Sequence, residues 1–382
     1  MLATVWVVVL LFASALAILY QGIAIVFAYQ MPTLDPLDPR GPGARPPLPR
    51  ISVVIAARNE FDDLPATLDS LLAQDLPVDE IVVVDGASTD GTSEVARARA
   101  PKVRLIEEPP LPAGWVGKSW ACAVGARATQ GEWILFLDAD VRLHPAAVRT
   151  ALAWATRESA DLASLATRIE VGSTWERIVM PFYVQMVLTY LRAPRVNRDT
   201  SSAAMANGQF TLVRRAAYEV VGGHEAIRTQ LVEDVALAQQ FRAHGLRLRV
   251  AWAPELAQTR MYRSRSEISE GILKTVHGTR YSTAVQIGRI VGLVGLFWLP
   301  LGVLPLGIVI ADPILIGTGA FLYVALFGKH IAFAHAVRAP AAYGLLYPVA
   351  VAFFVVLLAR SIRRGAGDRP VEWKGREYSL RG

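Results

Sequence analysis

Residues 80–92 read EIVVVDGASTDGT, a run of β-branched side chains that ends in an aspartate and a glycine-containing turn. Short apolar runs of this kind are typical of strands buried on both faces of a parallel sheet. The run ISVVIAA at 51–57 precedes it in the chain, and WILFL at 133–137 follows it. The pattern predicts strands at 51–57, 80–84, 103–106 and 133–137.

Helical segments separate these strands. Residues 64–74 place four leucines on one face, a helix opens near Asp90, and residues 118–129 are rich in alanine. Alternation of strands and helices predicts an α/β domain built on an open parallel sheet, in which ligands bind at the carboxyl ends of the strands. We expect the catalytic domain to span residues 51–260.

Polar and acidic residues follow three of the strands directly: Arg58-Asn59-Glu60, Asp85, and the pair Asp138 and Asp140. The carboxyl ends of parallel strands share one edge of a sheet, so these side chains should meet there. Carboxylates can hold a hard divalent cation against a diphosphate. An isolated Asp-x-Asp triplet also fits a solvated acidic turn, so the triplet alone does not decide between the two.

The chain has 382 residues, of which 53% are apolar, with a mean hydropathy of +0.34. No charged side chain occurs before Asp35, and the runs 291–311 and 339–359 are also uncharged. Each is long enough to cross a bilayer, which takes about 20 apolar residues. A fourth run, 314–337, is interrupted by Lys329 and His330 and qualifies less clearly. We expect an uncleaved N-terminal anchor at 1–30 and transmembrane segments within 285–360.

The net charge of +6 points to a membrane surface rather than to nucleic acid, because arginines cluster beside the apolar runs. The flanking segments are a spacer at 31–50 rich in Pro, Gly and Arg, an amphipathic interface helix within 261–284, and a basic tail at 361–382. The single cysteine, Cys122, fits a reducing compartment and packing within a helix.

Several segments together resemble the family 2 glycosyltransferases of GT-A fold. They are VVIAARNE (53–60), IVVVDGASTDGT (81–92), LPAGWVGKSWA (111–121) and WILFLDAD (133–140). Further segments are similar to the membrane-bound branch that includes hopene-associated and carotenoid glycosyltransferases and, more distantly, ceramide glucosyltransferases. These are MANGQFTLVRR (205–215), VGGHEAI (221–227), VEDVALAQQFRAHG (232–245), TRMYRS (259–264) and VEWKGREY (371–378).

The resemblance implies a role for each matched position. The Ala57 backbone and the side chains of Arg58, Glu60 and Asp85 would contact the nucleoside, with Asp85 reading a uracil imide. Lys118 would face the diphosphate, Asp138 would bind the ribose or the metal shell, and Asp140 would ligate Mg²⁺ or Mn²⁺. Asp234 would be the general base that deprotonates an acceptor hydroxyl. From the residues alone, Glu233 and Asp234 equally fit helix N-terminal charges, and Lys118 a solvated lysine at a helix start.

Two departures from the family pattern affect the expected chemistry. Many members have two adjacent aspartates where this chain has Asp85-Gly86, so base recognition could differ or depend on Asp85 alone. The Gln/Arg-x-x-Arg-Trp motif of processive synthases is absent after Asp234, which favours transfer of a single sugar. Arg260 and Arg263 stand in that region instead and are available to a diphosphate. His224 and His277 lack a second ligand at metal-binding spacing, so we expect them at a surface or an interface.

The sequence therefore predicts a multi-pass protein of the cell membrane with a cytoplasmic catalytic domain. It would move one sugar from a UDP-sugar to a hydroxyl of a lipid acceptor, without a nucleic-acid partner. The alternatives are a polyprenyl-phosphate glycosyltransferase, a non-catalytic protein that binds sugar nucleotides, and a transporter. Four spans would leave the basic tail on the side opposite the domain, against the positive-inside tendency. Run 291–311, with Pro300 and Pro305, is a candidate for a re-entrant segment.

Overall fold

A sheet of seven strands forms the centre of the protein, in a computed structural model that describes residues 2–37, 49–190, 193–278, 282–365, 371–373 and 376–378. Its strands, in spatial order, are β3 (Arg104–Glu107), β2 (Glu80–Asp85), β1 (Ile51–Ala57), β4 (Trp133–Asp138), β8 (Phe210–Arg214), β6 (Leu162–Ala166) and β9 (Leu248–Trp252). The bounds of β1 to β4 lie within one residue of those that the sequence predicts.

The sheet is mixed, so the expectation of an entirely parallel sheet is wrong at one strand. Strands β1 to β4 are mutually parallel, but β8 runs antiparallel to both β4 and β6. The direction of a strand depends on the path of the chain that connects it to its neighbour, and a long excursion separates β4 from β8. The apolar pattern of the strand itself does not record that path.

Helices cover both faces of the sheet, because successive side chains of a strand point to opposite faces. Val53 and Ile55 of β1 pack with helices α2 (Leu64–Leu72) and α5 (Ala147–Arg157). Val54 points to the other face and packs with α4 (Gly117–Arg127). The shorter helices around the sheet are α3 (Thr92–Arg97), α8 (Arg215–Val220), η1 (Gly223–Glu225) and α9 (Glu233–Ala243).

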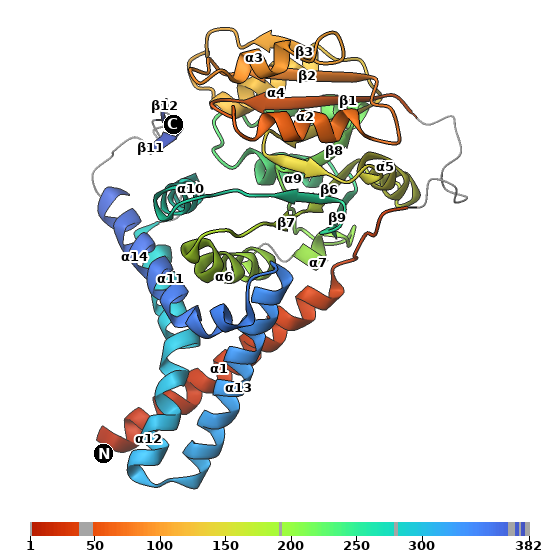
Figure 1. The fold of residues 1–382 in the computed structure, drawn as a ribbon. Helices are drawn as coiled ribbons and strands as arrows, with labels where there is room; N and C mark the ends of the chain where they lie inside the picture. The colour runs from red at the N-terminus through yellow and green to blue at the C-terminus, as the bar shows by residue number, and fades with distance from the viewer. Residues whose placement is uncertain are drawn as a thin grey trace.

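A smaller sheet and two helices connect the large sheet to the membrane segments. The small sheet has the order β5 (Val141–Leu143), β10 (Ala257–Thr259) and β7 (Arg168–Ile169). Helix α6 (Thr174–Tyr190) lies below the sheets in Figure 1, with the short α7 (Ala193–Val196) nearby, and α10 (Arg265–Gly278) lies to the left of the sheets. One apolar core runs from the sheet through α6 into the C-terminal helices, so the domain and the membrane segments pack as one body.

Among the residues that the structure describes, four helical segments are long and apolar enough to cross a membrane. The first is α1 (Leu2–Gln30), and the second is continuous through α11 (Thr283–Leu293), η2 (Val294–Trp298), η3 (Leu299–Gly302) and α12 (Val303–Ile310). The third is α13 (Pro313–Ala336), and the fourth joins η4 (Ala341–Leu346) to α14 (Tyr347–Gly365). Run 314–337, the least clear from sequence, is thus a full-length apolar helix.

The helices do not run side by side over their whole length. In Figure 1, α1, α12 and α13 form the narrow lower stem, whereas α14 lies higher, beside α11, and ends near α10. Residues Pro32–Leu34, within the predicted spacer, pair instead with Trp252 of β9. Residues 38–48, most of that spacer, lie outside the described residues. A C-terminal hairpin, β11 (Val371–Trp373) and β12 (Arg376–Tyr378), follows α14.

Candidate active site

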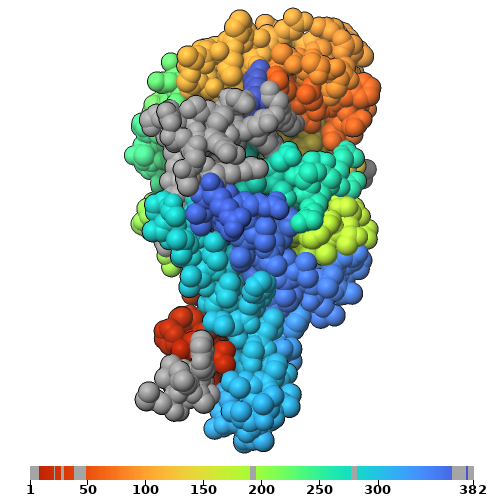
Figure 2. Space-filling view, turned by 90° about the vertical axis from the view of Figure 1, so that its left-hand side faces the viewer, coloured from red at the N-terminus to blue at the C-terminus, as the bar shows by residue number. Residues whose placement is uncertain are grey.

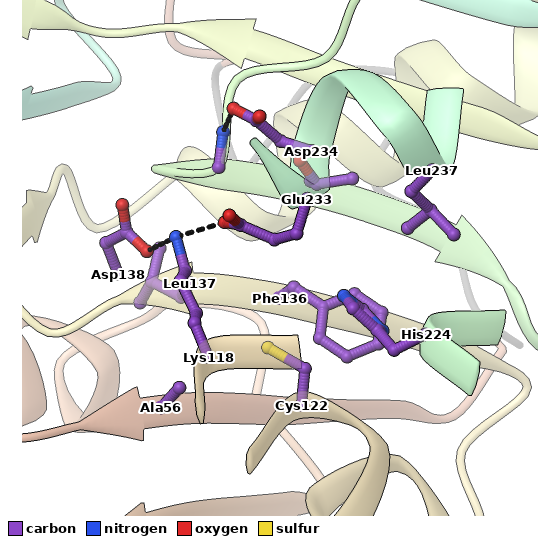
Figure 3. A pocket seen from close by; sticks show the side chains of 12 residues that line it. Ala56, Lys118, Cys122, Phe136, Leu137, Asp138, His224, Glu233, Asp234 and Leu237 are labelled. Atoms are coloured by element: carbon purple, nitrogen blue, oxygen red, sulfur yellow. Dashed lines mark hydrogen bonds and ion pairs between the residues drawn. The ribbon is translucent and has the colours of Figure 1, made fainter. Parts of the chain in front are cut away.

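The strand register brings several of the predicted site residues to one edge of the sheet. Ala57 at the end of β1 pairs with Asp85 at the end of β2, and Ala56 pairs with Asp138 at the end of β4. The turns that follow these strands therefore start side by side. Lys118, on the first turn of α4, lies over the same edge (Figure 3).

Lys118 joins two carboxylates that are far apart in the chain. Its Nζ lies 2.7 Å from Asp138 Oδ1 and 2.6 Å from Glu233 Oε1, as Figure 3 shows. Burial alone would lower the pKa of Lys118, but the two carboxylates outweigh it and raise the pKa well above its ordinary value. Lys118 is therefore charged and engaged with acidic groups, not solvated.

Asp234, on the first turn of α9, lies beside this network with both of its oxygens held by the backbone. Oδ2 accepts a hydrogen bond of 2.7 Å from Gly208 N, and Oδ1 accepts one of 2.8 Å from Val235 N. Burial, followed by the charge of Glu233, raises the pKa of Asp234 to about 6. The pKa of Glu233 is lowered instead: burial opposes the shift, and Lys118 outweighs it. An aspartate of raised pKa in a buried cluster has the properties of a general base.

Gly208 occupies the middle of this cluster, where an added side chain would press against all three charged groups. A Cβ there would lie 3.0 Å from Lys118 Nζ and 3.3 Å from both Asp234 Oδ2 and Glu233 Oε1. A cavity of about 20 Å³, enough for one water molecule, adjoins these groups. The acidic groups thus converge on a point that backbone and small ligands alone can approach.

The nucleoside residues implied by the resemblance surround the turn after β2. Asp85 is 4% exposed; its Oδ2 accepts a hydrogen bond from Ser88 N, and its Oδ1 has no partner among the described residues. Arg58 donates to the carbonyl of Gly86. The Glu60 backbone holds the local turn: its N–H donates to Thr92 Oγ1, and its carbonyl accepts from Leu64 N at the start of α2.

The two arginines expected near a diphosphate are engaged with carboxylates. Arg260 forms a two-pronged pair with the buried Glu176, with both N–O distances 3.0 Å. Arg263 lies 2.7 Å from Asp63, and its side chain is 46% exposed. Arg260 therefore has a structural partner, whereas Arg263 is the more accessible of the two.

Asp138 and Asp140 fit a metal carried with the substrate better than a preformed metal centre. Within the described ranges, no group of three or more His, Cys, Asp or Glu side chains is placed to hold a metal ion. Asp138 ends β4, and Asp140 follows one residue later, with Oδ2 accepting 2.9 Å from Thr259 Oγ1. Hard cations that bind diphosphates take one or two carboxylates and complete their shell with phosphate and water oxygens.

Some residues around the cluster were missed, or read wrongly, from the sequence. The sequence shows Glu233 only as a neighbour of Asp234, and nothing in its local pattern signals its pairing with Lys118. The expectation that His224 lies at a surface or an interface is wrong: it is 3% exposed and hydrogen-bonds Tyr218 Oη at 2.9 Å. Burial lowers its pKa to about 4, so the ring is neutral. Cys122 is buried within α4, as expected.

A mixed sheet with acidic groups and a lysine at its carboxyl edge defines a class, the nucleotide-sugar glycosyltransferases of GT-A fold. Residues 52–222 match the family model "Glycosyl transferase family 2". Together with the curated glycosyltransferases that the chain resembles, this match identifies the chain as a glycosyltransferase rather than a transporter.

Curated relatives and a solved structure extend the similarity. The chain is 28% identical to the 4,4'-diaponeurosporenoate glycosyltransferase of Staphylococcus aureus over 353 residues, which cover 86% of this chain and 88% of that one. It is 30% identical to the Staphylococcus haemolyticus protein of the same name over 50% of this chain, and the match spans about half (51%) of that relative. The mannosyltransferase PcManGT from Pyrobaculum calidifontis, solved with GDP-Man and Mn²⁺, has the same fold: its TM-score is 0.54 at 20% identity, over 95% of this chain and 99% of that one.

Proposed function

We propose that this glycosyltransferase moves one sugar from a nucleoside diphosphate donor, a UDP-sugar, to a hydroxyl of a lipid with inversion at the anomeric carbon. The observation that carries the proposal is the convergence of Lys118, Asp138, Glu233 and Asp234 on one point beside the sheet edge. The Staphylococcus relatives named for a carotenoid acid support a lipid acceptor of the carotenoid kind.

The bonds that form and break during transfer give Asp234 and Lys118 different roles. The acceptor oxygen forms a bond to the anomeric carbon, the bond from that carbon to the phosphate oxygen breaks, and the nucleoside diphosphate leaves. Asp234 takes the acceptor proton, and its raised pKa suits this role. Lys118 places a positive charge where the diphosphate departs.

A divalent cation, Mg²⁺ or Mn²⁺, would be held by Asp140 and Asp138 and would neutralise charge on the leaving diphosphate. PcManGT was solved with Mn²⁺, which is consistent with this assignment. The metal would bind one carboxylate oxygen of Asp138, while Oδ1 of the same carboxylate contacts Lys118. Ala57, Arg58, Glu60 and Asp85 would hold the nucleoside, and Arg263 would reach the diphosphate.

The position of Asp234 favours an acceptor that arrives from the membrane side. Its charge acts on Tyr183 of α6 and on Lys274 of α10, the two helices that pack against the C-terminal helices. The donor, by contrast, would enter over the strand ends of β1 and β2. A lipid and a water-soluble nucleotide can therefore approach the same carboxylate from opposite directions.

The substitution Asp234→Asn tests the role of the base. We expect donor binding to stay unchanged and transfer to fall by about 10²–10⁴-fold, the usual contribution of a positioned base. Asp35→Asn, an exposed aspartate near the end of α1, is the matched control and should transfer at the wild-type rate. Transfer would be measured with purified enzyme, a panel of UDP-sugars and total membrane lipid, with products identified by mass spectrometry.

The same variant tests a second candidate, in which the acceptor is an anion. The name of the relatives, diaponeurosporenoate, denotes a carboxylate, and an ionised carboxylate or polyprenyl phosphate attacks without losing a proton. Such an acceptor needs no general base. An active Asp234→Asn would therefore assign an anionic acceptor to this site and remove the hydroxyl from the proposal.

We further propose that the membrane is crossed three times, by α1, by the α11–α12 segment and by α13. The stem of Figure 1 consists of α1, α12 and α13, with α11 leading into it from above, and α14 would lie at the membrane surface beside α10 and α11. Run 291–311 then crosses rather than re-enters. This arrangement puts the basic end of α14 on the same side as the catalytic domain, in agreement with a cytoplasmic location and the positive-inside tendency.

Single introduced cysteines test this topology. The native Cys122 is buried and should give little background labelling. With a maleimide that does not cross membranes, Glu94→Cys and Arg363→Cys should be labelled only after the cytoplasmic face is opened. Ile310→Cys, beside the α12–α13 turn, should react from the opposite side. Labelling of Arg363→Cys together with Ile310→Cys in sealed cells would show that α14 crosses the membrane.

A further inference from the structure

A second buried carboxylate, Glu108, lies next to Asp85 at the edge of the sheet. Glu107 ends β3 opposite Asp85, and Glu108 N donates a hydrogen bond of 2.9 Å to the Asp85 carbonyl. The side chain of Glu108 is only 2% exposed and folds over Gly86, where a Cβ would lie 3.6 Å from Glu108 Oε2. Two carboxylates from adjacent strands thus border the same turn.

Within the part of the chain that the structure describes, each of these carboxylates has one oxygen without a hydrogen-bond partner. Among the described residues, Asp85 Oδ1 and Glu108 Oε1 are buried and accept no hydrogen bond, whereas Asp85 Oδ2 and Glu108 Oε2 each accept one. A buried acceptor without a donor is destabilising, and a charged one more so. Two of them side by side indicate a ligand that donates to both.

The C-terminal hairpin fixes the position of Glu108. Arg376 of β12 lies 2.5 Å from Glu108 Oε2 and 3.1 Å from the carbonyl of Gly86, which also accepts from Arg58. In Figure 2 the blue atoms of the C-terminal segment lie against the orange region that contains β2. A residue at the far end of the chain therefore holds one oxygen of Glu108 and leaves the other to a ligand.

The charge of the pair limits the chemistry of this ligand. Two carboxylates repel phosphate, so the diphosphate of the donor does not bind here. A nucleoside fits, because its base and ribose carry N–H and O–H donors and no negative charge. Lys118 and Asp138, one strand further along the sheet, remain for the charged part of the donor.

We propose that Asp85 Oδ1 and Glu108 Oε1 together form the nucleoside-reading pair of the donor site, and that Arg376 of the C-terminal hairpin is the positioning residue that aims Glu108. This inference rests on the proposed function and adds a determinant of donor specificity. One oxygen accepts a ring N–H of the base, and the other accepts a second N–H or O–H of the nucleoside.

The test begins with UDP, GDP, CDP and ADP on the full-length wild-type enzyme, and continues with the tightest binder. Glu108→Gln keeps the shape, but Arg376 would hold its amide oxygen, so the amide NH₂ would replace the acceptor. We expect the dissociation constant and the donor KM to rise by about 10-fold or more, the effect of losing a charged hydrogen bond, with kcat unchanged. Arg376→Gln should do the same, and Arg376→Lys should recover part of the loss.

The double variant separates positioning from a general structural effect. If Arg376 acts through Glu108, Arg376→Gln should add little to the loss in Glu108→Gln. Arg363→Gln, an exposed arginine near the end of α14, is the control and should bind nucleotide like the wild type. Three results would overturn the inference. They are a wild-type donor KM in Glu108→Gln, a fall in kcat as large as the rise in KM, and no binding of any of the four nucleotides. If Glu108→Gln is normal while Asp234→Asn loses transfer, the pair is refuted and the proposed function stands.

Discussion

Replacing Lys118 by methionine removes the one cation that contacts both Asp138 and Glu233 in the described cluster. Methionine keeps most of the length of the side chain, so the packing of α4 should survive while the charge is lost. Glu233, with a side chain only 7% exposed, then has a negative charge beside Asp234 without its closest counter-ion. The folded state should lose stability because a buried carboxylate is left uncompensated.

The contacts set the size of the effect. Removing one partner of a buried pair costs about 3–5 kcal/mol. Lys274 also acts on Glu233 and offsets part of the loss, and Asp138 is 27% exposed and partly hydrated. We therefore expect the lower end, about 3 kcal/mol, which is roughly a hundredfold change in the unfolding equilibrium. For a domain of this size that corresponds to a drop in Tm of roughly 6–12 °C.

The dependence on pH gives the prediction a signature. Lys118 depresses the pKa of Glu233 in the folded protein, so its contribution to stability is present above the unfolded pKa and is lost as pH falls through the folded pKa. In Lys118→Met this contribution is absent at neutral pH. The gap in Tm between wild type and variant should keep its full width down to about pH 4, the ordinary pKa of glutamate, and narrow as pH falls further toward the folded pKa of about 2.

The assay is thermal unfolding of the detergent-solubilised protein, followed by tryptophan fluorescence with divalent cations removed. Lys102→Met, at an exposed lysine, should leave Tm unchanged. Adding Glu233→Gln to Lys118→Met removes the unpaired negative charge of Glu233, so the double variant should regain much of the lost Tm. A variant with wild-type Tm at all pH values, or a double variant less stable than the single one, would refute the reasoning.

Three further predictions follow from the same site. The pKa of Asp234, raised by burial and a neighbouring carboxylate to about 6, predicts that kcat falls as pH drops through that value; a profile that is flat to about pH 5 would contradict it. Gly208→Ala should lower kcat/KM about tenfold or more, since its Cβ would lie 3.0 Å from Lys118 Nζ, whereas Gly288→Ala, with open space around it, should be silent. EDTA should abolish transfer and Mn²⁺ or Mg²⁺ restore it, with Asp140→Asn requiring more metal for half activity; full activity in EDTA would remove the metal from the proposal.

The part of the fold that the sequence predicted well is the part with local signals. Strands β1, β2 and β4 are uninterrupted runs rich in β-branched or aromatic side chains between polar turns, and each is buried because helices cover both faces of the sheet. Strand β8 has no such turn after it, since Arg215 begins α8 directly, and its reversed direction depends on the path of residues 139–209. Patterns of one strand do not contain that information.

The candidate site divides in the same way. Asp85 and Asp138 were predictable because they end strands, and strand ends meet at one edge whatever the rest of the chain does. The pairing of Lys118 with Glu233 depends on how α9 docks against α4, which no spacing in the sequence reports. The sequence gives no signal for Glu108, because this residue follows a short, half-exposed strand with no motif.

The C-terminal hairpin links the two open questions, donor recognition and topology. Arg376 contacts Gly86 and Glu108, so the hairpin and the catalytic domain are on one side of the membrane, and an even number of crossings must separate them. Residues 283–365 supply three apolar segments, so one of the three does not cross. Helix α14 is the one that lies beside α10 and α6 of the domain rather than in the stem. If α14 crossed in addition to α11–α12 and α13, Arg376 could not reach Gly86, so the labelling of Arg363→Cys and the nucleotide affinity of Arg376→Gln test the same contact by independent means.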